Sequence, residues 1–265
     1  MLNRKAQSPT QCPPRQPICD PNADPDWQPF PKRGTPLHPN VDLDAIALPS
    51  HLAGASGTVY SYVVTSVWSQ PMSPSAPRHA TVLRQYGSGP NFQGGVLTLC
   101  TCKHQMRAGM TAAEWVRGYW IAGFTSRQRY AGRGRHYLVY LSRIRVACSS
   151  QYELWQQLDP QTRRAKSSRV SPYGDLYEPR HGWDGTRPWS SCHYLHPRTD
   201  HVHADCWKSD IECEYYRRHP ALLVGDPSAT YLWERPRFYL DGEHERGSQT
   251  WAGVGDLLDS LRQVG

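Results

Sequence analysis

The chain has 265 residues and a formal net charge of +7, with 38% hydrophobic residues, 23 prolines and 21 glycines. This composition argues against a helical bundle and favours a loop-rich fold that contains strands. No apolar run approaches the roughly 20 residues that span a bilayer, and the first residues lack the apolar stretch of a secretion signal. We therefore expect a cytoplasmic protein that does not enter a membrane.

The distribution of proline and of apolar residues predicts two parts. Residues 1–56 are rich in proline and are expected to form an extended or disordered arm, and a single α+β domain is expected over residues 57–265. Apolar alternation predicts strands, and the capping boxes that begin at Thr111 and Ser150 predict short helices. The predicted strands are 58–67, 95–101, 119–124, 137–146, 221–224 and 236–240. With an amphipathic closing helix over 254–264, the expected fold is a curved, mostly antiparallel sheet or small barrel with short flanking helices and long polar loops.

Basic residues are concentrated in one part of the chain. Eleven Lys or Arg and one acidic residue, Glu114, lie between Arg78 and Tyr152, whereas residues 171–265 carry more acidic than basic residues. Such a block, interleaved with aromatic residues, is typical of a surface that binds nucleic acid, although a merely solvated surface is the alternative. The expected nucleic-acid contacts are Tyr62, Arg107, Arg127, Arg129, Tyr130, Arg133, Arg135 and Arg143.

The segment Cys100-Thr-Cys-Lys-His104 is the sharpest local cluster of reactive side chains. If the preceding strand continues through it, Cys100 and Cys102 share one face and Lys103 lies on the other. A thiol near Lys103 and Arg107 would have its thiolate favoured, which suits a nucleophile or a metal ligand. The alternative is that both cysteines are small buried residues and that Lys103 contacts a phosphate.

A second cluster combines histidine and cysteine in the polar region 159–219. The candidate metal ligands are His193, His196, His201, His203 and Cys206. These ligand types suit zinc, but the spacing contains no tight C-x-x-C pair, so a polar loop whose histidines line a groove is the alternative. The eight cysteines are expected to be reduced thiols or metal ligands.

Three stretches of the predicted strands also share a pattern. They are Val59-Tyr-Ser-Tyr-Val-Val64, then Asn91-Phe-x-Gly-Gly-x-Leu-Thr-Leu-Cys-Thr-Cys-Lys103 with Arg107, then Trp120-Ile-Ala-Gly-Phe-Thr-Ser126 with Leu138-Val-Tyr-Leu-x-Arg143. In this order they resemble the nucleotide-modification-associated domains of bacteria and phages, the second type in particular. Gly174-Asp175 and the histidines that follow fit the same pattern, and the resemblance covers roughly residues 58–243. The chain departs from it at His104, where proline is expected, and at Tyr119, where an acid is expected.

The resemblance implies a link to modified nucleotides or bases in a DNA-modification or defence context. A looser likeness is to small PUA-like β-barrels such as EVE and YTH domains, which hold a modified base in an aromatic pocket. The first hypothesis is a module that binds nucleic acid or nucleotides and recognises a modified base. The second is an enzyme that acts on a nucleotide or DNA base through Cys100, Cys102, Lys103, His104 and Asp175, with zinc as a candidate cofactor. The third is an interaction subunit that docks defence or modification proteins.

Overall fold

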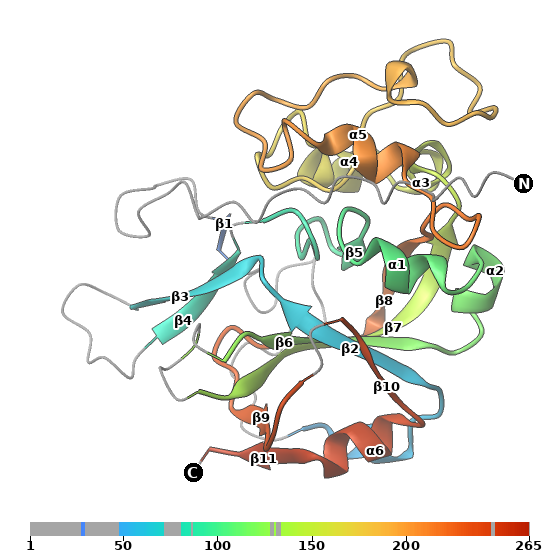
Figure 1. Cartoon of the computed structure of the whole chain (residues 1–265). Helices are drawn as coiled ribbons and strands as arrows, with labels where there is room; N and C mark the ends of the chain where they lie inside the picture. The colour runs from blue at the N-terminus through green and yellow to red at the C-terminus, as the bar shows by residue number, and fades with distance from the viewer. Residues whose placement is uncertain are drawn as a thin grey trace, which may run out of the picture.

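The fold is seen in a computed structural model that describes residues 28–29, 48–71, 81–85, 87–127, 130, 134–244 and 247–264. It is an α+β structure in which one curled, half-barrel sheet is flanked by short helices (Figure 1). Helix α6 and the strand pair β9–β11 lie on one side of this sheet. Helices α1 and α2 lie on the other side, beneath a layer that contains α3, α4 and α5.

The main sheet has the strand order β10-β2-β6-β7-β8-β5. Its strands are β2 (Val59–Val64), β5 (Thr98–Leu99), β6 (Trp120–Thr125), β7 (His136–Cys148), β8 (Leu222–Leu232) and β10 (Gln249–Trp251). The neighbours β2 and β6 are parallel and the other pairs on this path are antiparallel. Strand β9 (Phe238–Leu240) pairs with the start of β7 and with β11 (Leu261–Gln263).

A smaller sheet has the order β1-β4-β3. Its strands are β1 (Gln28–Pro29), β3 (Val67–Pro71) and β4 (Thr81–Gln85). Because β3 follows β2 after two residues, the second strand of the main sheet leads directly into this smaller sheet.

The core lies on both faces of the main sheet. All six residues of β6 are buried, and successive side chains point to opposite faces, as the period of a strand requires. Trp120, Ala122 and Phe124 pack with Leu257 of α6, whereas Ile121 packs in the second cluster with Trp115 of α2. A strand buried on both faces is apolar throughout, which is why 119–124 was predictable as a strand.

The helices are short, and a side chain caps the N-terminus of α2, α3, α4 and η2. They are η1 (Ser50–Gly54), α1 (His104–Ala108), α2 (Ala112–Trp115), α3 (Gln151–Gln157), α4 (Pro160–Lys166), η2 (Ser191–His193), α5 (Trp207–Glu212) and α6 (Val254–Asp259). The capping box predicted at Thr111 is present, with both reciprocal bonds to Glu114. At Ser150 the side chain caps α3, but the Glu153 carboxylate accepts from Ser149 N instead, so the second box is incomplete.

Several predicted elements begin or end at other residues in the structure. Strand β5 ends at Leu99 and not at residue 101, and the predicted helix over 254–264 gives way to β11 after Asp259. Leu52 of η1 is buried in the core, so the folded domain includes residues before 57. Strands β1, β3, β4, β10 and β11 and helices α1, α4 and α5 were not predicted, and β8 extends well beyond the predicted 221–224. Within the described ranges, no helix is long and apolar enough to cross a bilayer.

Candidate functional site

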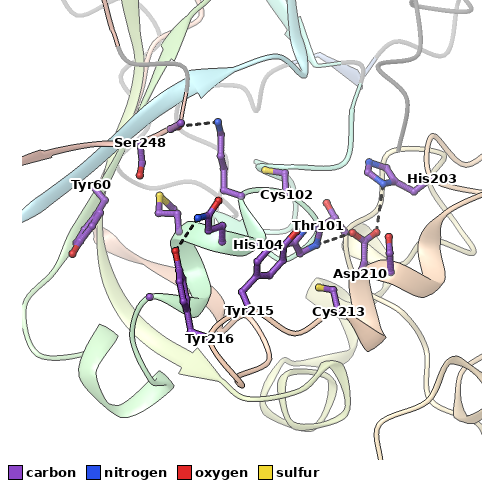
Figure 2. Close-up of a pocket in the computed structure, with 16 residues that line it drawn as sticks. Tyr60, Thr101, Cys102, His104, His203, Asp210, Cys213, Tyr215, Tyr216 and Ser248 are labelled. Atoms are coloured by element: carbon purple, nitrogen blue, oxygen red, sulfur yellow. Dashed lines mark hydrogen bonds and ion pairs between the residues drawn. The ribbon is translucent and has the colours of Figure 1, made fainter. Parts of the chain in front are cut away.

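A pocket of about 650 Å³ lies where α1 meets α5 and the turn that follows α5 (Figure 2). Residues 101–106 and Gly109 form one wall, and Tyr60, His203 and the segment 247–248 contribute further lining. The opposite wall consists of Ser209, Asp210, Cys213, Tyr215 and Tyr216. This is within the size range of small-molecule sites, about 300–1,000 Å³. Residues that are far apart in the sequence therefore converge on one cavity.

The first wall begins with a turn that a buried arginine holds. After β5 the chain turns at residues 100–103, where Lys103 adopts a left-handed conformation (φ 55°) and precedes α1. Arg107 is fully buried and donates from Nε to Cys102 O (2.7 Å) and from Nη2 to Cys100 O (2.9 Å). Its Nη1 donates to Ala221 O (2.6 Å) and to Pro220 O (3.3 Å). The prediction that Arg107 contacts nucleic acid is wrong, because its guanidinium is enclosed by backbone carbonyls.

The two cysteines of this turn do not share a face, because the strand has already ended. Cys100 is fully buried away from the pocket, and burial raises the pKa of its thiol well above the ordinary value. Cys102 lines the pocket, but burial raises its pKa to about 12 in spite of Arg107 and Lys103 nearby. A Cβ at Gly89 would lie 2.8 Å from Cys102 Sγ, which shows how tightly that loop covers the thiol. The predicted thiolate nucleophile is therefore not supported at either position.

Lys103 carries a positive charge into the pocket. Its Nζ donates to Gly247 O (3.1 Å) and lies 5.1 Å from the ring centroid of Tyr62. Burial lowers the pKa of Lys103 below its ordinary value. Tyr62 is only 1% exposed, and its hydroxyl accepts a hydrogen bond from Tyr140 at 2.7 Å. The predicted base contact at Tyr62 is wrong, because the ring packs in the core behind Lys103.

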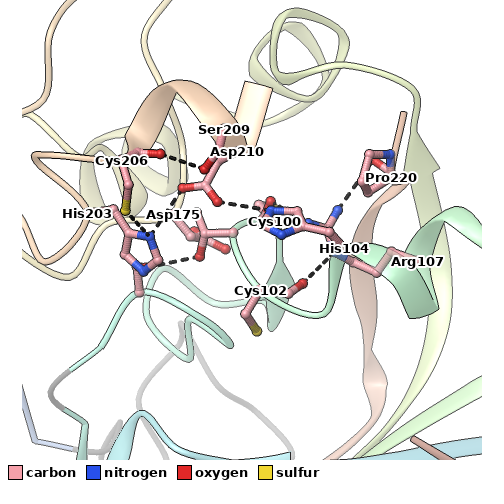
Figure 3. A network of polar contacts seen from close by, with 12 residues as sticks. Cys100, Cys102, His104, Arg107, Asp175, His203, Cys206, Ser209, Asp210 and Pro220 are labelled. Carbon is pink, nitrogen blue, oxygen red and sulfur yellow. Dashed lines mark hydrogen bonds and ion pairs between the residues drawn. The ribbon is translucent and has the colours of Figure 1, made fainter. Parts of the chain in front are cut away.

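A buried carboxylate connects two histidines at the other end of the pocket (Figure 3). Asp210 Oδ1 lies 3.0 Å from His104 Nε2, and its Oδ2 lies 3.4 Å from His203 Nδ1. Tyr177 donates its hydroxyl hydrogen to Asp210 Oδ2 at 2.7 Å. Burial acts to raise the pKa of Asp210, but His203, His104 and the Tyr177 hydroxyl outweigh it, so the net shift is downward. This arrangement places two imidazoles beside one carboxylate, and both favour its charged form.

Asp210 was missed by the sequence analysis, although a signal for it existed. Trp207 and Ile211 form the buried stripe of α5, and Asp210 lies on the same stripe. A carboxylate at a core position of an amphipathic helix is rarely buried without partners, so it marks a network of polar side chains. Tyr215, Tyr216 and Cys213, which also line the pocket, had no comparable sequence signal.

Asp175 is not a member of the pocket. It is fully buried, and neither of its carboxylate oxygens has a hydrogen-bond partner among the described residues. Burial raises its pKa, and the nearby Lys166 opposes that rise. The ammonium of Lys166 is itself fully buried and donates to Asn91 O (3.2 Å) and Asn91 Oδ1 (3.1 Å). The catalytic role predicted for Asp175 finds no support in this pocket, because Asp175 does not line it.

The residues predicted to bind zinc have separate environments. His193 stacks on Trp183, His196 Nδ1 contacts Pro197 O, and His203 contacts Asp210. The buried His201 contacts Gly174 O through Nε2, and burial lowers its pKa to about 4, so its ring is neutral. Cys206 is disulfide-bonded. No three His, Cys, Asp or Glu side chains are grouped to hold a metal in the part of the chain that the structure describes, so this ligand set is a wrong prediction.

The residues predicted to form one cationic surface lie in different environments in the structure. Arg127 is exposed and pairs with Glu243 (2.6 Å), and Arg135 lies over the ring of Tyr239. Tyr130, an expected nucleic-acid contact, is buried against Tyr137. Arg143 is exposed on β7 but does not line the pocket. Outside this set, Arg84 pairs with Glu234. Arg129 and Arg133 lie outside the described residues.

We expect the Asp210 network to stabilise the fold above pH 3.8 and to fail in acid. Because the folded-state pKa of Asp210 lies below the ordinary 3.8, its contribution is present above that value and is lost as the pH falls through the lower pKa. Asp210→Asn should cost about 1.5–3 kcal/mol of unfolding free energy at pH 7. Urea unfolding of both proteins between pH 7 and pH 2 measures the difference. A gap that stays constant down to pH 2 would contradict the assignment.

The chain was compared with protein-family models, curated proteins and solved structures, and none of the three comparisons gave a match. The function must therefore be inferred from the geometry of the pocket.

Proposed function

We propose that the pocket binds a nucleotide, or one nucleotide of a nucleic-acid strand, and that the base it recognises is a modified one. The observation that carries this is the joint presence of the Lys103 ammonium and the side chains of Tyr60, Tyr215 and Tyr216 in one cavity of about 650 Å³. A nucleotide combines an anionic group, which an ammonium attracts, with a planar base, which tyrosine rings stack against. The curled sheet and the resemblance to nucleotide-modification-associated and PUA-like domains support the same conclusion.

The charges around the pocket favour contact with few phosphates. Arg107 is enclosed, and Arg84 and Arg127 are paired with glutamates, so three of the eleven basic residues between Arg78 and Tyr152 already have partners within the protein. Each phosphate neutralised on a single strand contributes about −0.7 to the slope of log affinity against log salt. We expect a slope near that single-contact value for an oligonucleotide, and not the steep slope of an extended groove.

The proposal is tested by removing the pocket charge. Lys103→Met keeps the length of the side chain, and it should weaken binding of a 2′-deoxynucleoside 5′-monophosphate by about 10- to 150-fold, the value of a charge-assisted hydrogen bond. Isothermal titration with the four ordinary monophosphates and with those of 5-hydroxymethylcytosine and N6-methyladenine measures it. Arg143→Met, which removes an exposed charge outside the pocket, is the matched control and should bind as the wild type does. If no nucleotide binds the wild-type protein at millimolar concentration, the proposal is wrong.

A second candidate function is an enzyme that acts on the bound nucleotide. His104 lines the pocket while its Nε2 is held at 3.0 Å from Asp210, which resembles the carboxylate-oriented imidazole of general acid–base catalysis. In this case His104→Gln should abolish conversion of a nucleotide, followed by liquid chromatography and mass spectrometry, while leaving its affinity within about threefold. Conversion that survives this substitution would exclude His104 as the acid or base.

A further inference from the structure

Backbone strain is concentrated at the pocket. Among the described residues, three that are not glycine have a positive φ: Lys103 (55°), Tyr216 (53°) and Arg217 (61°). Lys103 and Tyr216 line the pocket, and Arg217 is the next residue in the chain. Bulky side chains rarely adopt this conformation, and residues that retain it cluster at functional sites, where the surrounding structure enforces the strain.

Tyr216 and Arg217 are the two central residues of a tight hairpin turn. Tyr215 N donates to Arg218 O (2.9 Å), and Arg218 N donates to Tyr215 O (2.8 Å). A two-residue turn with both central residues in the left-handed region favours Asn-Gly, because those residues tolerate a positive φ. The chain instead places a tyrosine and an arginine there. The turn would be more stable with other residues, so stability alone does not account for the tyrosine.

The side chain of Tyr216 is held at the mouth of the pocket and still presents its ring. Its hydroxyl accepts a hydrogen bond from Gln105 Nε2 of α1 at 2.8 Å, which fixes the ring beside that helix (Figure 2). The residue is nevertheless 64% exposed, one of three large apolar or aromatic residues that the described part of the chain leaves so open. A ring that is oriented at one end and uncovered on its face is suited to receive a planar ligand.

We propose that Tyr216 is the stacking wall of the pocket, which covers the base of the bound nucleotide while Lys103 contacts its phosphate. This inference rests on the proposed function and assigns the two parts of the ligand to two sides of the site. This role accounts for the strained turn, which directs an aromatic ring over the cavity. A relaxed Asn-Gly turn would place no ring there. Tyr216 is therefore a binding residue for the base.

The Tyr216→Asn variant distinguishes the effect of ring stacking on affinity from the effect of backbone strain on stability. Asparagine tolerates the left-handed conformation, so the melting temperature should rise by about 2 °C, whereas affinity for 2′-deoxycytidine 5′-monophosphate should fall about tenfold or more. Binding of ribose 5-phosphate, which has no base, should not change. Tyr216→Phe keeps the ring and loses only the bond to Gln105, so its affinity for the nucleotide should stay within about threefold of the wild type.

Arg217→Gly is the matched control, because it relieves the same strain one residue later and leaves the Tyr216 ring in place. It should raise the melting temperature and bind both ligands as the wild type does. If Tyr216→Asn binds the nucleotide normally while Lys103→Met does not, the stacking role is wrong and the proposed function stands. If the wild type binds ribose 5-phosphate as tightly as the nucleotide, the base contributes nothing to affinity and the inference is also wrong. If the wild type binds neither, both proposals fail.

Discussion

Replacing Arg107 with alanine should destabilise the protein by about 4 kcal/mol or more, among the largest losses of any single substitution in the chain. The guanidinium donates to four backbone carbonyls, of Cys100, Cys102, Pro220 and Ala221, and the residue is fully buried. It continues the contact between the end of β5 and the start of β8 beyond the last paired residues, Leu99 and Leu223. Without it, buried carbonyls lose their donors and a cavity opens under the turn that positions Lys103.

Urea unfolding measures this loss, and two further variants make the result specific. Arg117→Ala, which removes an exposed arginine from the neighbouring α2 turn, should change the unfolding free energy by less than about 0.5 kcal/mol. Arg107→Lys keeps the charge but lacks the planar fork of donors, so it should lose about half as much as alanine. If Arg107→Ala instead unfolded like the wild type and lowered only the affinity for oligonucleotides, the arginine would be a phosphate contact after all.

Arg107 also shows why the sequence alone misread part of the site. A count of charges treats every arginine as surface, because arginine is almost never fully buried unless it is paired. The partners here are backbone carbonyls, which carry no sequence signal. Apolar alternation, in contrast, depends only on burial of one or both faces, and it was sufficient to predict β2, β6 and most of β7. The strands were therefore predictable, but the contacts that Arg107 makes with the end of β5 and the start of β8 were not.

Only some of the residues that line the pocket were predictable from the sequence, for a related reason. Lys103 and His104 lie together in the sequence, and the structure places both in one cavity. Asp210, which lies between His104 and His203, comes from a helix more than one hundred residues later, and only the fold brings it there. The cysteine prediction failed because the strand ends at Leu99: the turn then hides Cys100 and leaves Cys102 as a thiol whose pKa is raised to about 12.

The second large effect is expected at Lys166 and Asp175, two fully buried side chains of opposite charge that influence each other without a direct ion pair. Lys166→Met and Asp175→Asn each preserve volume but leave the other buried group without the opposite charge nearby. Leaving a buried polar group unsatisfied costs about 1–3 kcal/mol, and more when the group is charged. Burial lowers the pKa of Lys166 to about 8 and raises that of Asp175, so burial disfavours the charged form of each side chain. Each single variant should therefore shift the urea midpoint strongly downward.

The double variant decides whether the two charges depend on each other. When both are removed, no uncompensated charge remains, so the double substitution should cost at least about 1 kcal/mol less than the sum of the two single losses. Simple additivity would show that the two side chains stabilise the fold through separate contacts, such as the bonds from Lys166 to Asn91. Because neither residue lines the pocket, the folded double variant should bind nucleotide as the wild type does. A double variant that remained folded but lost nucleotide binding would show that Asp175 or Lys166 contributes to the binding site.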